Sequence, residues 1–278
     1  MLSFLNSIIK FNPRYIKLNG WVPDPLNRKY LSFDRSVLSL LPGKVEYQNS
    51  DDVDLRPYTS PRHNQRSTST CVAQSVIKAL EIKRIIEHGH ENHVDLSVLD
   101  LYYGARERMT PSKVKEDSGT HICLACDVLR DLGVCRDEMH PFSTSNLFKK
   151  PSVMASREGR LNRISKHFKI KTYGNHRLDD IIFNLKAGNP VVFGTAVGTD
   201  WTSYKGGKEP LWVESNPKGR HAICCVGFVD GLFIIENSWS ESWGSDGFGF
   251  LTPEAIKHPS TKDLWVIVNG SEAWTEKK

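Results

Sequence analysis

The chain has 278 residues, 39% of them hydrophobic and 25% charged, so it is long enough to bury one large apolar core or two smaller ones. Its 37 basic and 32 acidic residues give a formal net charge of +5 without a basic block, which excludes a strongly basic nucleic-acid-binding protein. The longest apolar stretch, 222–229, is far shorter than the roughly 20 residues of a membrane-spanning helix. We expect neither a nucleic-acid nor a membrane partner.

The N-terminus and the cysteines predict the compartment. Residues 1–10 hold a short apolar run but lack the positive flank and the small-residue cleavage site of a signal peptide. The cysteines form no regular disulfide framework, and two of them are adjacent: Cys71, Cys123, Cys126, Cys135, Cys224 and Cys225. We expect an intracellular, cytoplasmic protein, and a viral or virion setting is also consistent with these features.

Residues 1–50 carry four prolines among scattered aromatic residues, and only 37–41 has a compact apolar pattern. This composition predicts an irregular N-terminal arm or a short pro-segment. Because it precedes the first predicted helix, we expect it to pack on the body or to lie across a cleft. The body is expected to span 51–278.

Helical patterns dominate 51–141. Apolar residues recur at helical spacing over 71–88, after a polar loop at 65–70. A second helix is expected from Ser97, its N-cap, and a third over 120–132.

Strand patterns dominate 142–278, after two further helices near 152–164 and 178–186. The expected strands are 167–173, 190–197, 221–229, 232–236, 247–251 and 264–268. Asp230-Gly231 predicts a tight hairpin between two of them. A helical lobe followed by an antiparallel sheet lobe is an α+β arrangement with a natural cleft between the lobes.

Cys71 begins a predicted helix, where free backbone N–H groups and the helix dipole stabilise a thiolate. A lone cysteine is more often a small buried apolar residue, so a nucleophile also needs a base and a group that orients the base. His221 begins one strand and Asn237 follows the next, and the hairpin between them brings the imidazole and the amide together. Trp239 and Trp243 are expected to cover this hydrogen bond and keep water from it.

These residues resemble the papain-like cysteine peptidases. The shared pattern is Gln65 six residues before Cys71, a downstream His221, and Asn237-Ser238-Trp239 beginning sixteen residues after that histidine. Further segments agree, namely 53–56 with the start of the mature domain and 243–249 with a glycine-rich strand. Segments 20–24 and 264–267 are more similar to the compact microbial and viral branch, and the resemblance covers about 20–270.

The resemblance implies a two-lobe papain-like fold and peptide-bond hydrolysis through an acyl-enzyme. Cys71 is then the nucleophile, His221 the general base and acid, and Asn237 the residue that orients the imidazole. The side chain of Gln65 and the backbone N–H of Cys71 form the oxyanion hole. The substrate is a peptide or protein, no metal or other cofactor is required, and the oligomeric state stays open.

The sequence departs from the family pattern close to the nucleophile. Thr68 stands where many relatives have a disulfide-forming cysteine, and Val72 replaces a usual tryptophan. Arg66 replaces a usual glycine, and Arg220 stands before His221 where papain has an acid. None of these changes removes a group that the mechanism needs, but together they make substrate preference hard to transfer.

Two alternatives to protein hydrolysis stay open. One is a catalytically silent papain-like scaffold used for binding or assembly. The other is an amidase, isopeptidase or transpeptidase acting on a non-protein peptide, for which the loop 199–218 beside the expected cleft is decisive.

Other candidate sites fit the sequence less well. Cys123 and Cys126, with Cys135 and His140, have the composition of a zinc site, but the first two lie in an amphipathic helix where core packing explains them. Glu236 should point to the face opposite Asn237, so it is not expected to act in a triad. Residues in loops or at helix ends are expected at the solvated surface: His63, Asn64, His88, His90 and His93.

Overall fold

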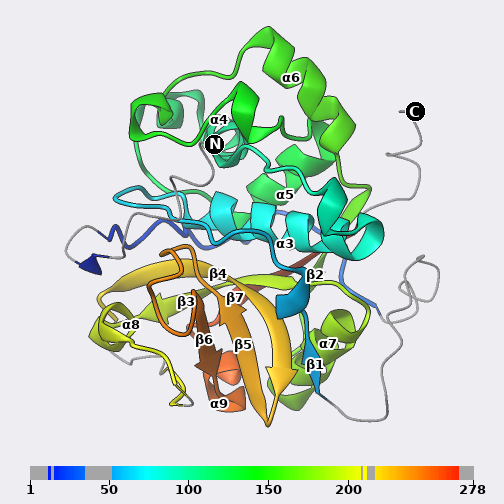
Figure 1. Ribbon diagram of the computed structural model, residues 1–278, viewed down its shortest axis with the longest axis vertical. Helices are drawn as coiled ribbons and strands as arrows, with labels where there is room; N and C mark the ends of the chain where they lie inside the picture. The colour runs from blue at the N-terminus through cyan, green and yellow to red at the C-terminus, as the bar shows by residue number, and fades with distance from the viewer. Residues whose placement is uncertain (1–11, 14–15, 35–51, 208, 212–216, 269–278) are drawn as a thin grey trace.

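Helices form one half of the molecule, above the sheet in Figure 1. The computed structural model describes residues 12–13, 16–34, 52–207, 209–211 and 217–268. The longer helices of this half are α3 (Cys71–His88), α4 (Val98–Met109), α5 (Ile122–Asp131) and α6 (Val153–Gly159). Short 3-10 helices lie beside them: η2 (Arg56–Tyr58), η3 (His90–Asn92), η4 (Pro111–Lys115), η5 (Asp137–Met139), η6 (Thr144–Asn146) and η7 (Arg160–Asn162).

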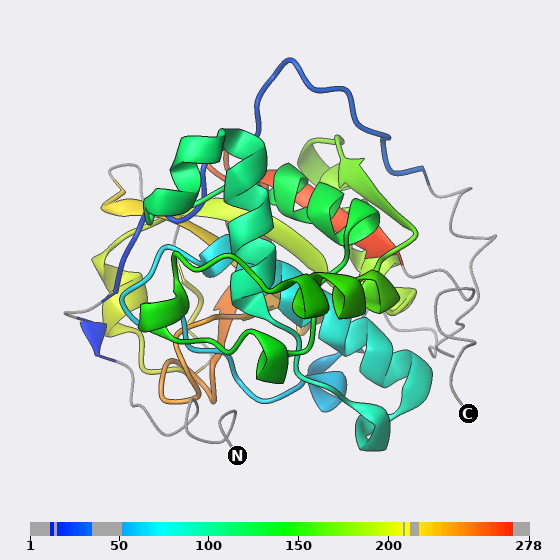
Figure 2. The same cartoon turned by 90° about the horizontal axis from the view of Figure 1, so that it is seen from above.

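An antiparallel sheet forms the other half. Its strands are β1 (Val53–Asp54), β2 (Lys166–Ile170), β3 (Val191–Val197), β4 (Gly219–Val229), β5 (Leu232–Glu236), β6 (Phe248–Leu251) and β7 (Lys262–Val268). They follow the order β2-β7-β3-β4-β5-β6, and β1 pairs with β4. The helices of this half are α7 (Gly174–Lys186), α8 (Thr199–Ser203) and α9 (Pro253–Lys257). Figures 1 and 2 show the two halves, so the predicted α+β fold is confirmed.

Helix α3 is buried on all sides from Cys71 to Ile85, so it is the central element of the fold. Its apolar side chains belong to one core that also includes residues of β3, β4 and β7. Each fully buried Val, Leu or Ile side chain contributes about 1.5–3 kcal/mol. The hydroxyl of Ser75 donates to the carbonyl of Ala222 at 3.0 Å, which ties the first turns of α3 to β4.

Most predicted elements are present, and α3 and β5 have the bounds that the sequence predicts. Ser97 caps α4 by accepting a hydrogen bond from the N–H of Asp100 at 3.1 Å. Asp230 and Gly231 have φ angles of 51° and 78°, as a two-residue hairpin requires. The short elements β1, α8 and α9 were not predicted. Within the described part of the chain, no helix has the length and apolar character needed to cross a bilayer.

Part of the predicted N-terminal arm is described. Residues 16–34 pass between the two halves and then along the edge of the sheet (Figures 1 and 2). Asp24 fastens them: its carboxylate accepts from Lys169 Nζ at 2.9 Å and from Trp265 Nε1 at 2.8 Å. Its own N–H donates to Asp263 at 2.7 Å. The compact run predicted at 37–41 lies outside the described residues.

Candidate active site

Cys71 is the first residue of α3 and follows a loop whose own side chains hold its shape. The hydroxyl of Thr68 donates to the carbonyl of Gln65 at 2.6 Å and lies 2.8 Å from the hydroxyl of Thr70. Hydrogen bonds therefore hold the loop at the position where a disulfide is common among papain-like peptidases. All six cysteines are unpaired.

His221 and Asn237 lie at the ends of adjacent strands, as the hairpin predicts. Nε2 of His221 is 2.8 Å from Oδ1 of Asn237, and both residues are buried. The same amide oxygen accepts from the N–H of Ser238 at 2.8 Å, which fixes its direction. Nδ1 of His221 is buried and has no hydrogen-bond partner among the described residues. The backbone N–H of Ala222 donates to the thiol of Cys71, so the sulfur lies next to the residue that follows the histidine.

The two tryptophans have different roles in the packing. The ring of Trp239 covers the imidazole of His221, with centroids 4.8 Å apart and planes inclined by 31°. Trp243 packs edge-on against Trp239 at 5.7 Å and donates its indole N–H to the carbonyl of Trp201 at 2.7 Å. Trp239 therefore shields the histidine directly, and Trp243 supports Trp239 from behind.

The side chain of Gln65 is fully buried and held at both ends of its amide. Oε1 accepts from the hydroxyl of Ser238 at 2.7 Å and from Nε1 of Trp239 at 3.2 Å. Nε2 donates to the carbonyl of Thr68 at 2.8 Å and to the carbonyl of Lys17 at 3.3 Å. The Lys17 carbonyl thus occupies the donor that the resemblance predicts for the oxyanion of a substrate.

Residues 16–21, called here the covering segment, lie over Cys71. A Cβ atom on Gly20 would be only 2.7 Å from the Sγ of Cys71, so glycine allows this close approach. The indole of Trp21 packs against Gly194 of β3 so closely that a Cβ atom there would overlap the ring. Cys71 has no exposed surface as a result.

Backbone and side-chain contacts hold the covering segment on both sides. Its Gly20 carbonyl accepts from the N–H of Thr120 at 3.0 Å, and the N–H of Asn19 donates to the carbonyl of Arg220 at 2.7 Å. Lys17 Nζ donates to Asp117 at 2.7 Å. Thr120 belongs to the helical half and Arg220 to the sheet half, so the segment bridges them.

Burial keeps both candidate catalytic groups neutral. It raises the pKa of the Cys71 thiol to about 12, although the N–H groups of Ala222 and Val72 act in the opposite direction. It lowers the pKa of His221 to about 4, a shift that the hydrogen bond to Asn237 partly offsets. A thiolate–imidazolium pair therefore requires water to reach the site.

Three residues expected at the solvated surface are instead packed in the protein. Asn64 is 7% exposed, and its side-chain oxygen accepts from the N–H of Arg66 at 2.9 Å. The side chain of His63 is 17% exposed, and its Nε2 lies 3.2 Å from Glu81. The side chain of His93 is 15% exposed, with Nε2 3.0 Å from Asp95. These expectations were wrong because tertiary contacts with α3 and with the residues that follow β5 bury these loops.

Two further residues shape the site, Asp117 and Ser238. Asp117 accepts from the N–H of Ser69 at 3.0 Å and from the hydroxyl of Tyr102 at 2.8 Å, and it lies in a polar loop that carries no motif. Ser238 donates to Gln65, and its sequence signal is its place in Asn237-Ser238-Trp239.

The candidate zinc set is not brought together. Cys123 lies near Tyr30 and Asp24, whereas Cys135 lies near Asp100. Glu236 points away from the imidazole toward Lys78, 3.4 Å away, as expected.

Comparisons with known proteins agree with this geometry. A model of the papain family of cysteine proteases matches residues 49–259. The chain is 27% identical over 282 residues to an uncharacterized peptidase C1-like protein of Acanthamoeba polyphaga mimivirus, covering 94% of this chain and 88% of the relative. It is 24% identical over 266 residues to cysteine proteinase 2 of Entamoeba histolytica, covering 88% and 78%.

Solved structures show the same fold. Xylellain, a cysteine protease from Xylella fastidiosa, has a TM-score of 0.76 at 26% identity, covering 92% of this chain and 98% of that one. Digestive procathepsin L2 proteinase from Tenebrio molitor larval midgut has a TM-score of 0.69 at 18% identity, covering 96% and 86%. Since the family model spans most of the chain, this protein belongs to the papain family of cysteine proteases.

Proposed function

We propose that the protein hydrolyses peptide bonds with Cys71 as the nucleophile. The observation that carries the proposal is the His221–Asn237 hydrogen bond of 2.8 Å, which leaves the other ring nitrogen of the histidine without a partner beside a cysteine at a helix N-terminus. A base with one nitrogen oriented and the other available is the arrangement that nucleophilic catalysis by a thiol needs.

The proposed reaction has two steps. The Cys71 thiolate attacks the carbonyl carbon, and the N–H of Cys71 and Nε2 of Gln65 donate to the oxyanion. His221 protonates the departing amine, which leaves an acyl-enzyme, and then takes a proton from the water that hydrolyses it. Asn237 keeps the imidazole oriented through both steps.

Turnover in this proposal begins with departure of the covering segment. Its Gly20 backbone lies against the sulfur, and its Lys17 carbonyl accepts from Gln65. Both contacts occupy positions that a substrate carbonyl would need. Trp21 packs its ring directly on Gly194, so we propose that a bulky aromatic side chain of the substrate takes this place when the segment leaves.

The test is hydrolysis of fluorogenic peptides that carry tryptophan or phenylalanine. We expect activity in the Trp21→Ala protein, in which the covering segment loses its anchor, and less in the unaltered chain. Adding Cys71→Ser or His221→Ala should lower kcat/KM by about a thousandfold or more. Mass spectrometry after alkylation should show Cys71 modified far faster than the other five cysteines.

The alternatives give different results. A silent scaffold would show no hydrolysis and slow, uniform alkylation of all six cysteines, which would contradict the proposal. Selective alkylation of Cys71 without cleavage of any peptide or protein would support an amidase, isopeptidase or transpeptidase instead.

A further inference from the structure

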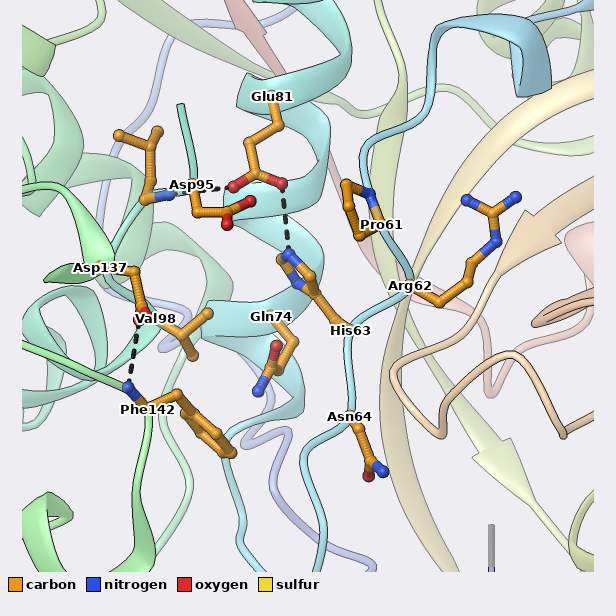
Figure 3. Close-up of a pocket in the computed structure, with 11 residues that line it drawn as sticks. Pro61, Arg62, His63, Asn64, Gln74, Glu81, Asp95, Val98, Asp137 and Phe142 are labelled. Carbon is orange, nitrogen blue, oxygen red and sulfur yellow. Dashed lines mark hydrogen bonds and ion pairs between the residues drawn. The ribbon is translucent and has the colours of Figure 1, made fainter. Parts of the chain in front are cut away.

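A second cluster of ionisable side chains lies about 15 Å along α3 from Cys71. Glu81 on α3 and the loop residues His93 and Asp95 each offer one ligand atom, and these three atoms lie within 4.8 Å of one another. His63 approaches the same carboxylate from another segment, with Nε2 3.2 Å from Glu81 Oε2. Figure 3 shows Glu81, Asp95 and His63 around one pocket. Two histidines and two carboxylates thus converge from three parts of the chain.

The cluster faces a cavity of about 50 Å³, which has room for an ion and an attached water. Glu81 is fully buried, and Nδ1 of His63 is buried without a hydrogen-bond partner among the described residues. The amide of Gln74 and the carboxylate of Asp137 also line the cavity (Figure 3). The lining is therefore rich in oxygen and nitrogen donors.

Negative charge is in excess around this cavity. Glu81, Asp95 and Asp137 all contribute carboxylates. Burial, together with the charges of Asp95 and Glu81, raises the pKa of Asp137 to about 6. Two cations lie nearby, Lys78 at 3.7 Å from Glu81 and Arg62 in the cavity lining, but both are shared with Glu236, at 3.4 Å and 3.6 Å. A bound cation would offset this excess.

We propose that Glu81, His93 and Asp95 bind a divalent transition metal ion, Zn²⁺ foremost, with His63 as the fourth ligand. Zinc holds nitrogen and oxygen ligands at about 2.0–2.2 Å, which puts tetrahedral ligands roughly 3.4 Å apart. The His93–Asp95 pair is at 3.0 Å and the His63–Glu81 pair at 3.2 Å, both close to this spacing. The ligand atoms of Glu81, His93 and Asp95 lie within 4.8 Å of one another, so these three form the core of the site and His63 joins it through Glu81. Imidazole with carboxylate is a donor set that favours zinc and its neighbours over Mg²⁺.

The site does not depend on the proposed peptidase chemistry, and the test separates the two. Titration calorimetry uses the full chain carrying Cys71→Ser, because a reactive thiol beside His221 would itself bind zinc. We expect one equivalent of Zn²⁺ to bind and Mg²⁺ not to compete. His93→Ala and Asp95→Asn should each weaken Zn²⁺ binding by at least about tenfold.

His176→Ala is the matched control, because His176 also faces an aspartate, Asp179, 3.9 Å away, but at an exposed position on α7. It should leave Zn²⁺ binding unchanged. Equal binding by the parent, His93→Ala and Asp95→Asn proteins, or no binding by the parent, would overturn the proposal. Glu81 is left intact because its carboxylate also accepts from the N–H of Leu96 at 3.1 Å and supports the fold. Circular dichroism and metal-free unfolding curves check that the variants are folded.

Discussion

Single glycines allow the covering segment to lie on the candidate active site. The backbone of Gly20 lies against the sulfur of Cys71, and the indole of Trp21 packs on Gly194 of β3. Neither position has room for a Cβ atom. The masking of Cys71 is therefore sensitive to the addition of one methyl group.

Gly194→Ala should expose Cys71. The added Cβ overlaps the Trp21 ring, and overpacking of this kind costs about 1–3 kcal/mol, so alkylation of Cys71 should accelerate roughly 5- to 100-fold. Gly104→Ala is the control, because its Cβ would meet Val128 at 3.1 Å in the helical half, away from the segment. Alkylation rates are compared by mass spectrometry. An unchanged rate in Gly194→Ala would mean that the contact with Trp21 does not hold the segment.

His221 makes stability fall in acid. Its pKa in the folded protein, about 4, lies below the ordinary value of 6.5, so between these pH values the unfolded chain binds a proton that the folded protein does not. Stability is lost as the pH falls through this window, by up to roughly 3 kcal/mol. Urea unfolding as a function of pH measures the loss, and His221→Gln should flatten the curve. If the variant kept the full dependence, other groups would have to explain it.

At the scale of elements, a buried cation joins α3 to β5. Lys78 is 2% exposed and donates to the carbonyl of Pro61 at 2.8 Å and to the hydroxyl of Ser60. It also lies 3.7 Å from Glu81 and 3.4 Å from Glu236, the last residue of β5. Because Asn237 follows directly, this cation helps to fix the end of the strand that carries the histidine's partner.

Lys78→Met should destabilise the protein by about 3–5 kcal/mol, because it takes the most deeply buried cation away from two buried carboxylates. Lys113→Met removes an exposed ion pair with Glu116 of 2.7 Å and should cost less than about 1 kcal/mol. Chemical denaturation of both variants gives the comparison. Similar small losses would show that Glu81 and Glu236 are adequately solvated without Lys78.

Local sequence signals predicted the elements that depend on local order. Apolar residues recur at helical spacing along the whole of α3, so its bounds were predicted correctly. The Asp230-Gly231 turn likewise identified the hairpin. The two-residue strand β1 forms through its pairing with β4. Because β4 is far away in the sequence, no local pattern predicts this strand. The burial of His63 and Asn64 likewise depends on residues far away in the sequence.

At the scale of the whole molecule, the sequence predicted the two-part fold and an arm that packs on the body or lies across the cleft. It did not predict which residues of the arm reach Cys71. The contact depends on how Gly20 fits against Cys71 and Trp21 against Gly194. The partners in each contact are far apart in the sequence, so no repeating pattern relates them. The types and spacing of Cys71, His221 and Asn237 were sufficient to recognise the family, and their catalytic roles stay a proposal.

The fastening of Asp24 to Lys169 and Trp265 has a kinetic consequence. It tethers the covering segment a few residues from the site that the segment fills, so the segment acts as an intramolecular competitor at an effective concentration of the order of millimolar. Dilution of the protein does not change this competition. The apparent affinity for any substrate is lowered by the fraction of molecules that are unmasked. A substrate must therefore bind tightly or be present at high concentration to displace the tethered segment.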